Sequence, residues 1–340
     1  MVTATSSPGR PPGMHDVARV AGVSHQTVSR VVNGHPSVSP ATRTRVLQAI
    51  ADLGYRRNTA ARALVTRRSR TLGVVTLSTT LFGPTSTLLS VEAAARRAGW
   101  FVSVASTVAV GPADLDPAFE HFADQAVEGV VVIAPHLAAA RAAEALAGRV
   151  PLVMVADLPR GSGIRSVAVD QRGGARLAVR HLLELGHRDI AHLAGPDDYF
   201  DAHARTLGWR QELRAHGVRP GALAHGDWSA ASGYRACQDL LAEGVPDAVF
   251  VGNDLMALGA VRALGEAGLD VPGDVSVVGF DDMDGSDYFG PPLTTVRQDF
   301  TALGRRAIEL LQQLIDGATP PRAASIPAEL VRRSSTAARG

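Results

Sequence analysis

This 340-residue chain contains no lysine and only one cysteine. Cys237 is the single cysteine, which excludes an internal disulfide framework and a cysteine-rich metal site and favours a cytoplasmic location. Catalytic motifs are missing too: no G-x-x-x-x-G-K-[ST] loop, no H-E-x-x-H pair and no G-x-S-x-G elbow occurs. We expect no catalytic residue, no cofactor and no metal; an enzyme fused to a basic domain is the alternative from another class.

Long apolar runs are absent as well. None reaches the roughly 20 residues that a membrane-spanning helix needs, and the N-terminus lacks the apolar core of a signal peptide. Residues 1–12 are rich in serine, proline and glycine, so we expect a disordered tail there. The rest of the chain is long enough for two or three domains.

The net charge of +1 conceals a strong asymmetry along the chain. Residues 1–70 hold eleven arginines against Asp16 and Asp52, a balance of +9, which leaves −8 for the remaining 270 residues. A basic head on an acidic body suits a head that neutralises phosphates and a body with another task. The basic part is therefore predicted to bind nucleic acid.

Residues 14–32 have the pattern of two short helices joined by a tight turn. Gly22 can adopt the positive φ of the corner, Ser24 can cap the second helix, and small or branched apolar residues supply the contact between them. His25, Gln26, Ser29 and Arg30 then share the outer face of the second helix. Gln pairs with adenine and Arg with guanine, so this face suits base recognition; an ordinary surface helical hairpin is the alternative.

A third helix is predicted over residues 39–53, since Ser39-Pro40 is a typical helix start and Gly54 a typical stop. The three helices form a predicted helix-turn-helix domain over 13–57. Residues 58–64 are a helical candidate too short to be stable alone. With DNA and a second copy as partners, Leu64 would wedge into the minor groove; a plain basic linker through residue 70 is the alternative.

From residue 71 the pattern changes to short β-branched runs that alternate with helical stretches. The predicted strands are 72–77, 101–106, 130–134, 152–155, 167–169, 190–194, 248–252 and 275–279, and the predicted helices are 88–98, 173–185, 206–215, 231–242 and 256–267. This alternation predicts parallel sheets with helices on both faces, in two lobes. Ligands bind beyond the carboxyl ends of such strands, where the chain places Asp157, residues 197–201, Asn253-Asp254 and Asp281-Asp282.

The chain resembles the LacI-type repressors over nearly its whole length. The segments that carry the resemblance are AGVSHQTVSRVVNG, GYRRNTAARAL, HLLELGHRDIAHLAGP, ARTLGWR, GDWSAASGY, GNDLMALGAVRA, VSVVGFDD and PPLTTVRQDF, in the family's order. The resemblance implies an α/β fold: an N-terminal three-helix helix-turn-helix head plus hinge helix, then a two-lobed periplasmic-binding-protein-like body with parallel sheets. It implies a hinge helix and linker over 58–70 and a body over 71–335, with an N-lobe of about 71–168 and 297–335 and a C-lobe of about 169–296.

The resemblance also implies which residues bind. The DNA-binding positions are Ser24, His25, Gln26, Thr27, Ser29, Arg30, Asn33, Asn58 and Leu64, and the ligand-binding positions are Asp157, Arg205, Trp228, Asn253, Asp281 and Phe300. Asp157 matches only after a one-residue shift; without the shift, Ala156 takes that position. Three pocket positions depart from the serines that the resemblance implies: Leu77, Tyr199 and Asp201. His25 replaces a phenol, so ligand and operator preference can differ from those of the family.

The function that the resemblance implies is repression of sugar-utilisation genes. A homodimer would hold a palindromic double-stranded DNA operator, and a small sugar, with a galactoside as the first candidate, would release it. A co-repressor such as a purine, which tightens DNA binding, is the alternative. No leucine heptad precedes Gly340, so we expect a dimer rather than a four-chain assembly.

Overall fold

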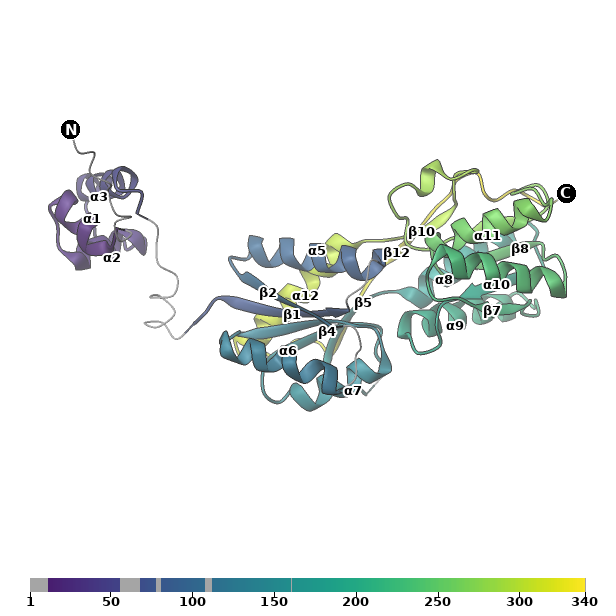
Figure 1. Cartoon of the computed structure of the whole chain (residues 1–340), viewed down its shortest axis with the longest axis horizontal. Helices are drawn as coiled ribbons and strands as arrows, with labels where there is room; N and C mark the ends of the chain where they lie inside the picture. The colour runs from purple at the N-terminus through teal and green to yellow at the C-terminus, as the bar shows by residue number, and fades with distance from the viewer. Residues whose placement is uncertain (1–11, 56–67, 78–80, 108–111, 160, 340) are drawn as a thin grey trace, which may run out of the picture. The chain divides into compact units, whose positions relative to one another are not determined.

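A computed structural model of the chain describes residues 12–55, 68–77, 81–107, 112–159 and 161–339. The chain divides into two compact units, one ending at Arg68 and one beginning at Ser69 (Figure 1). Among the described residues, no helix combines the length and apolar character needed to cross a membrane.

The first unit holds three short helices, α1 (Met14–Ala21), α2 (His25–Val32) and α3 (Pro40–Asp52). Gly22 adopts a φ of +62°, as the predicted corner requires, and the Ser24 hydroxyl accepts a hydrogen bond from the Thr27 N–H at 3.1 Å. The helices close on a core of fully or nearly fully buried small apolar side chains: Val17, Ala18, Ala21, Val28, Val31, Val46 and Ala49. The predicted three-helix head is confirmed.

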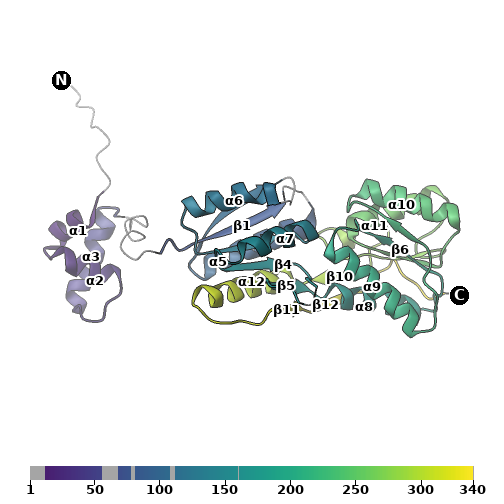
Figure 2. The same cartoon turned by 90° about the horizontal axis from the view of Figure 1, so that it is seen from below.

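The N-lobe of the second unit is built on a six-stranded parallel sheet of order β2-β1-β3-β4-β5-β11. Its strands are β1 (Thr71–Leu77), β2 (Phe101–Thr107), β3 (Gly129–Ile133), β4 (Leu152–Val155), β5 (Arg165–Val169) and β11 (Ala323–Ile326). Helices α5 (Phe82–Arg97) and α12 (Phe300–Ile315) pack on one face, and α6 (Pro112–Asp124) and α7 (Leu137–Leu146) on the other (Figure 2). Gly304 lets α12 approach α5 closely, because a Cβ there would lie 2.5 Å from the Ser90 carbonyl carbon.

The C-lobe repeats this three-layer plan on a four-stranded parallel sheet of order β7-β6-β8-β9. Its strands are β6 (Ile190–Ala194), β7 (Leu223–His225), β8 (Ala248–Val251) and β9 (Ser276–Val278). Helices α8 (Gln171–Glu184) and α9 (Phe200–Ala215) cover one face, and α10 (Ala230–Glu243) and α11 (Asp254–Glu266) the other (Figure 1). In both lobes the strands run parallel, so all their carboxyl ends gather at one edge.

The chain passes between the lobes three times: from β5 to α8, from β10 (Thr295–Gln298) to α12, and from β11 to β12 (Ala328–Val331). Strands β10 and β12 form an antiparallel pair. The expected assignment of 297–335 to the N-lobe is wrong at its end. The Val277 N–H donates to the Ser335 carbonyl at 2.8 Å and the Arg339 N–H to the Leu185 carbonyl at 2.9 Å, so the last segment lies on the C-lobe.

Candidate functional site

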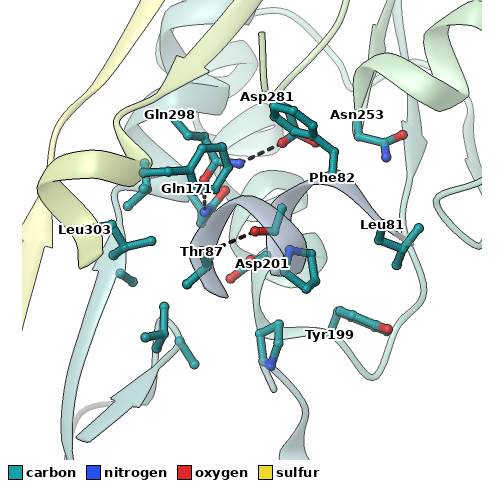
Figure 3. A pocket seen from close by; sticks show the side chains of 18 of the residues that line it. Leu81, Phe82, Thr87, Gln171, Tyr199, Asp201, Asn253, Asp281, Gln298 and Leu303 are labelled. Atoms are coloured by element: carbon teal, nitrogen blue, oxygen red, sulfur yellow. Dashed lines mark hydrogen bonds between the residues drawn. The ribbon is translucent and has the colours of Figure 1, made fainter. Parts of the chain in front are cut away.

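A cavity lies between the two lobes at the carboxyl ends of their strands (Figure 3). Its volume is about 80 Å³, several times the roughly 10–15 Å³ that one water needs. The N-lobe contributes an apolar wall and the C-lobe most of the polar groups. The lining residues that carry the argument are Phe82, Thr87, Ala156, Gln171, Tyr199, Asp201, Arg205, Trp228, Asn253, Asp281, Gln298 and Phe300.

Arg205 on α9 is the one arginine among the lining residues, and it is held by protein acceptors. Its Nε donates to Gln171 Oε1 at 2.8 Å, one terminal nitrogen donates to the Gly252 carbonyl, and the other lies 3.6 Å from Asp281 Oδ1. The guanidinium also lies 3.8 Å from the centroid of the Phe280 ring. These contacts fix one orientation of a charged side chain that is only 4 % exposed.

Asp281, which follows β9, has backbone and side chain under unusual constraint. Its φ is +112°, a region that residues other than glycine rarely adopt, and strain of this kind is concentrated at functional sites. Its Oδ1 accepts a hydrogen bond from Gln298 Nε2 at 2.7 Å (Figure 3). Burial raises the pKa of Asp281 to about 6, while Arg205 opposes that rise.

Asn253 and Trp228 are held together in the C-lobe. The Asn253 Oδ1 caps α11 by accepting from the Met256 N–H at 2.9 Å, and its Nδ2 donates to the Trp228 carbonyl at 3.1 Å. Trp228 has a φ of +73°, and its indole packs so closely on Gly195 that a Cβ there would lie 2.2 Å from the ring. The Asn253 side chain therefore positions the loop that carries the indole.

Phe300 and Phe82 form the apolar side of the cavity from the N-lobe. Phe300 begins α12 and Phe82 begins α5, and their rings meet edge to face with centroids 5.7 Å apart. The predicted positions Arg205, Trp228, Asn253, Asp281 and Phe300 thus all line one cavity.

Asp157 is the exception among the predicted ligand-binding residues. It is exposed and does not line the cavity, whereas Ala156 does. The lining of the cavity therefore favours the alignment without a one-residue shift, and the ligand-binding role of Asp157 stays a prediction. The hydrogen bonds of β4 explain the difference, because the Ala156 N–H still pairs with the Val167 carbonyl and so fixes which side chain faces inward.

Two glutamines of the cavity were not predicted. Gln171 begins α8 and Gln298 ends β10, at two of the three crossings between the lobes, and Gln171 Nε2 donates to Gln298 Oε1 at 2.9 Å (Figure 3). Together they connect Arg205 to Asp281 across the crossings. Gln171 follows the predicted strand 167–169, which was the available signal, whereas no strand was predicted next to Gln298. Strand ends alone also do not show where the chain crosses between the lobes.

The outer face of α2 in the first unit presents polar side chains to solvent. Gln26 and Arg30 are exposed, and within the described residues neither makes a hydrogen bond or ion pair. Thr27 Oγ1 lies 2.9 Å from Ser24 Oγ, Asn33 Nδ2 donates to Ser29 Oγ at 3.3 Å, and the His25 ring stacks on His15 with centroids 4.6 Å apart. The predicted positions Asn58 and Leu64 lie outside the described residues.

Comparison with known families finds two matches in this chain. Residues 13–58 match the model of bacterial regulatory proteins of the lacI family. Residues 179–336 match a periplasmic binding protein-like domain. The first match covers the three-helix head and the second covers most of the C-lobe and the return segment.

Relatives match over almost the full chain. The lactose operon repressor of Escherichia coli (strain K12) is 40 % identical, and the match covers 97 % of this chain and 92 % of the repressor. The transcriptional regulator CelR of Thermobifida fusca is 38 % identical, and the match covers 91 % of this chain and 94 % of CelR. A lac repressor dimer solved with operator and the anti-inducer ONPF aligns with a TM-score of 0.87 at 40 % identity, over 97 % of this chain and all of that one. A CelR–cellobiose complex aligns with a TM-score of 0.72 at 34 % identity, over 95 % of this chain and 99 % of that one.

Proposed function

Because the chain belongs to the LacI family of bacterial transcriptional regulators, we propose that it represses sugar-utilisation genes and is released from its operator by a small sugar. Relatives named for lactose and a neighbour solved with cellobiose support a sugar as ligand. A galactoside is the first candidate. The protein would act in the cytoplasm, where its DNA target lies.

For the DNA side we propose a homodimer that places two copies of α2 in successive major grooves of a palindromic operator. The solved lac repressor dimer on operator supports this arrangement. In each copy, Gln26 and Arg30 would contact base edges, while Ser24, Thr27, Ser29 and Asn33 would contact phosphates or adjust the helix, and His25 would change the base preference. Asn58 and Leu64 would act at the hinge, as the family implies.

The observation that carries the ligand side is the cavity in which Arg205, Asp281, Asn253 and Trp228 converge. Carboxylate, guanidinium and amide groups satisfy vicinal hydroxyls, and an indole covers the apolar face of a sugar ring. Phe300 would close the opposite side. A sugar there touches both lobes, so it binds open and closed arrangements unequally, which is the condition for any shift in operator affinity.

The proposal is tested by measuring the affinity of the purified protein for a palindromic operator duplex and for a random duplex by fluorescence anisotropy. We expect tighter binding to the operator, and a fall in that affinity when a galactoside, cellobiose or maltose is titrated. A purine that tightens operator binding would support a co-repressor instead. Equal affinity for both duplexes, whatever small molecule is added, would overturn the proposed function.

A further inference from the structure

Most polar side chains that line the cavity already make hydrogen bonds to other groups of the protein. Thr87 Oγ1 donates to the Gly83 carbonyl at 2.8 Å, and both ends of the Asn253 amide are engaged. The Gln171 and Gln298 amides bind each other, Arg205 and Asp281. Each of these side chains is therefore held in place by the protein, with only part of its hydrogen-bonding capacity left for a ligand.

Tyr199 and Asp201 are the exceptions among the polar residues that line the cavity. Within the described part of the chain, neither side chain makes a hydrogen bond, and Tyr199 makes only ring contacts with His136 and Trp228. Both lie at the start of α9, two residues apart, and Figure 3 shows both among the side chains around the cavity. One is a carboxylate, which accepts only, and the other a phenol, which both donates and accepts.

The charges around the cavity also favour an uncharged ligand that donates hydrogen bonds. Two carboxylates, Asp201 and Asp281, face the cavity against the single guanidinium of Arg205, which is already bound to Gln171 and the Gly252 carbonyl. Burial raises the pKa of Asp201 to about 6, with Arg205 lowering it and Asp157 raising it further. The partly buried carboxylate has lost water and gained no protein donor.

We propose that Asp201 is a specificity-determining residue that accepts hydrogen bonds from the hydroxyls of an uncharged sugar and excludes sugars that carry a phosphate or a carboxylate. The proposal rests on the proposed function of this cavity as a sugar site. A hydroxyl supplies the donor that Asp201 lacks, whereas a second anion supplies no donor and is repelled. An uncharged serine at this position would not impose that exclusion.

A purely structural role for Asp201 makes a different prediction. Asp201 lies in the first turn of α9, where a negative charge stabilises the helix through its dipole. If that were its only role, Asp201→Asn would lower the melting temperature slightly and leave ligand discrimination unchanged. Measuring discrimination rather than affinity alone therefore separates the two roles.

The test compares binding of galactose and glucose with binding of their 6-phosphates by isothermal titration calorimetry, in the full-length protein. We expect the wild type to prefer the uncharged sugar by at least about 10-fold. Asp201→Asn should weaken binding of the uncharged sugar by about 10-fold to 100-fold, the usual range for a hydrogen bond to a charged group. The ratio of the affinity for the uncharged sugar to the affinity for its 6-phosphate should also fall.

The matched control is Asp197→Asn, which removes the same charge four residues earlier, in the loop that leads into α9. The Asp197 side chain is 88 % exposed and does not line the cavity, so both affinities should stay unchanged. An unchanged preference in Asp201→Asn, or a wild type that prefers the 6-phosphate, would overturn the role of Asp201 and leave the sugar-responsive repressor standing. Failure of all these and other sugars to bind would overturn the proposed function and this inference with it.

Discussion

At the scale of single residues, the two ends of this protein use polar groups in opposite ways. On α2, Gln26 and Arg30 are left exposed and without a protein partner among the described residues, so their donors are available to a macromolecule. In the cavity, Arg205 and Asp281 are buried and tied to neighbouring groups before any ligand arrives. The first arrangement allows adaptation to a surface, and the second is the preorganisation that the proposed sugar site would need.

Arg30→Ala tests the exposed face. We expect a loss of about 1–3 kcal/mol in operator binding, because a bidentate contact to guanine would be removed, and a relaxed preference at one base pair. A series of gel shifts with single-base operator variants measures both effects. Discrimination equal to that of the wild type at every position would exclude Arg30 from base recognition.

Asp254→Asn tests a buried carboxyl at the start of α11, next to Asn253 of the cavity. Burial is the main cause that raises the pKa of Asp254 to about 8, and the negative charge of Asp281 is the second. Hydrogen bonds from the Thr295 hydroxyl and the Met283 N–H oppose this rise. Since the folded-state pKa lies above the unfolded one, this group contributes stability below about pH 4 that is lost as the pH rises toward 8.

We therefore expect the free energy of unfolding of the wild type to fall, relative to Asp254→Asn, between pH 5 and pH 8. The asparagine retains an acceptor for Met283 and a partner for Thr295, so packing is preserved. Urea unfolding at several pH values gives the comparison. A constant difference between the two proteins across this interval would contradict the raised pKa.

At the scale of elements, the helix cap of α2 and the segments that cross between the lobes position the functional side chains. Helix α2 has only eight residues, too few to be stable by itself, so its cap and its core contacts hold it in place. In the body, the crossings from β5 to α8 and from β10 to α12 bring Gln171 and Gln298 together. This hydrogen bond joins two of the three segments that cross between the lobes.

Ser24→Ala removes the acceptor for the Thr27 N–H and should destabilise α2 by about 1 kcal/mol. Faster amide hydrogen exchange over residues 25–32 and weaker operator binding are the expected results. Ser24→Asp keeps an acceptor at the cap and should retain slow exchange. If the alanine variant exchanges as slowly as the wild type, the cap does not hold this helix.

At the scale of the whole molecule, a basic head and an acidic body divide two tasks. The division predicts that the sugar response and DNA binding can be separated by mutation. Arg205→Ala removes a group held between Gln171 and Asp281 in the cavity, and the cavity lies in a different compact unit from α2.

We expect Arg205→Ala to bind the operator like the wild type and to lose release by the inducing sugar. Removing the Arg205 guanidinium also takes the cationic neighbour away from the buried Asp281, so the stability of the variant is checked by thermal unfolding. The anisotropy titration measures the response. Normal release at normal sugar concentrations would remove Arg205 from the ligand site.

Much of this fold could be predicted because its local patterns are strong. The predicted strands 152–155 and 190–194 have the bounds found in the structure, and the capped helices of the head begin and end within a residue or so of their predicted bounds. Helices α6, α7 and α12 were not predicted. The alanine-rich α7 and the Pro117 within α6 give a weak periodic signal, and only packing on the sheets stabilises them.

The sequence by itself determined the helix-turn-helix head, the alternation of strands and helices, and the segregation of charge, because each depends on neighbours within a few residues. Only the tertiary structure decided that Ala156 rather than Asp157 faces the cavity, that residues 328–339 return to the C-lobe, and that Gln171 and Gln298 meet. These outcomes depend on strand register and on crossings between lobes, where residues more than a hundred positions apart become neighbours.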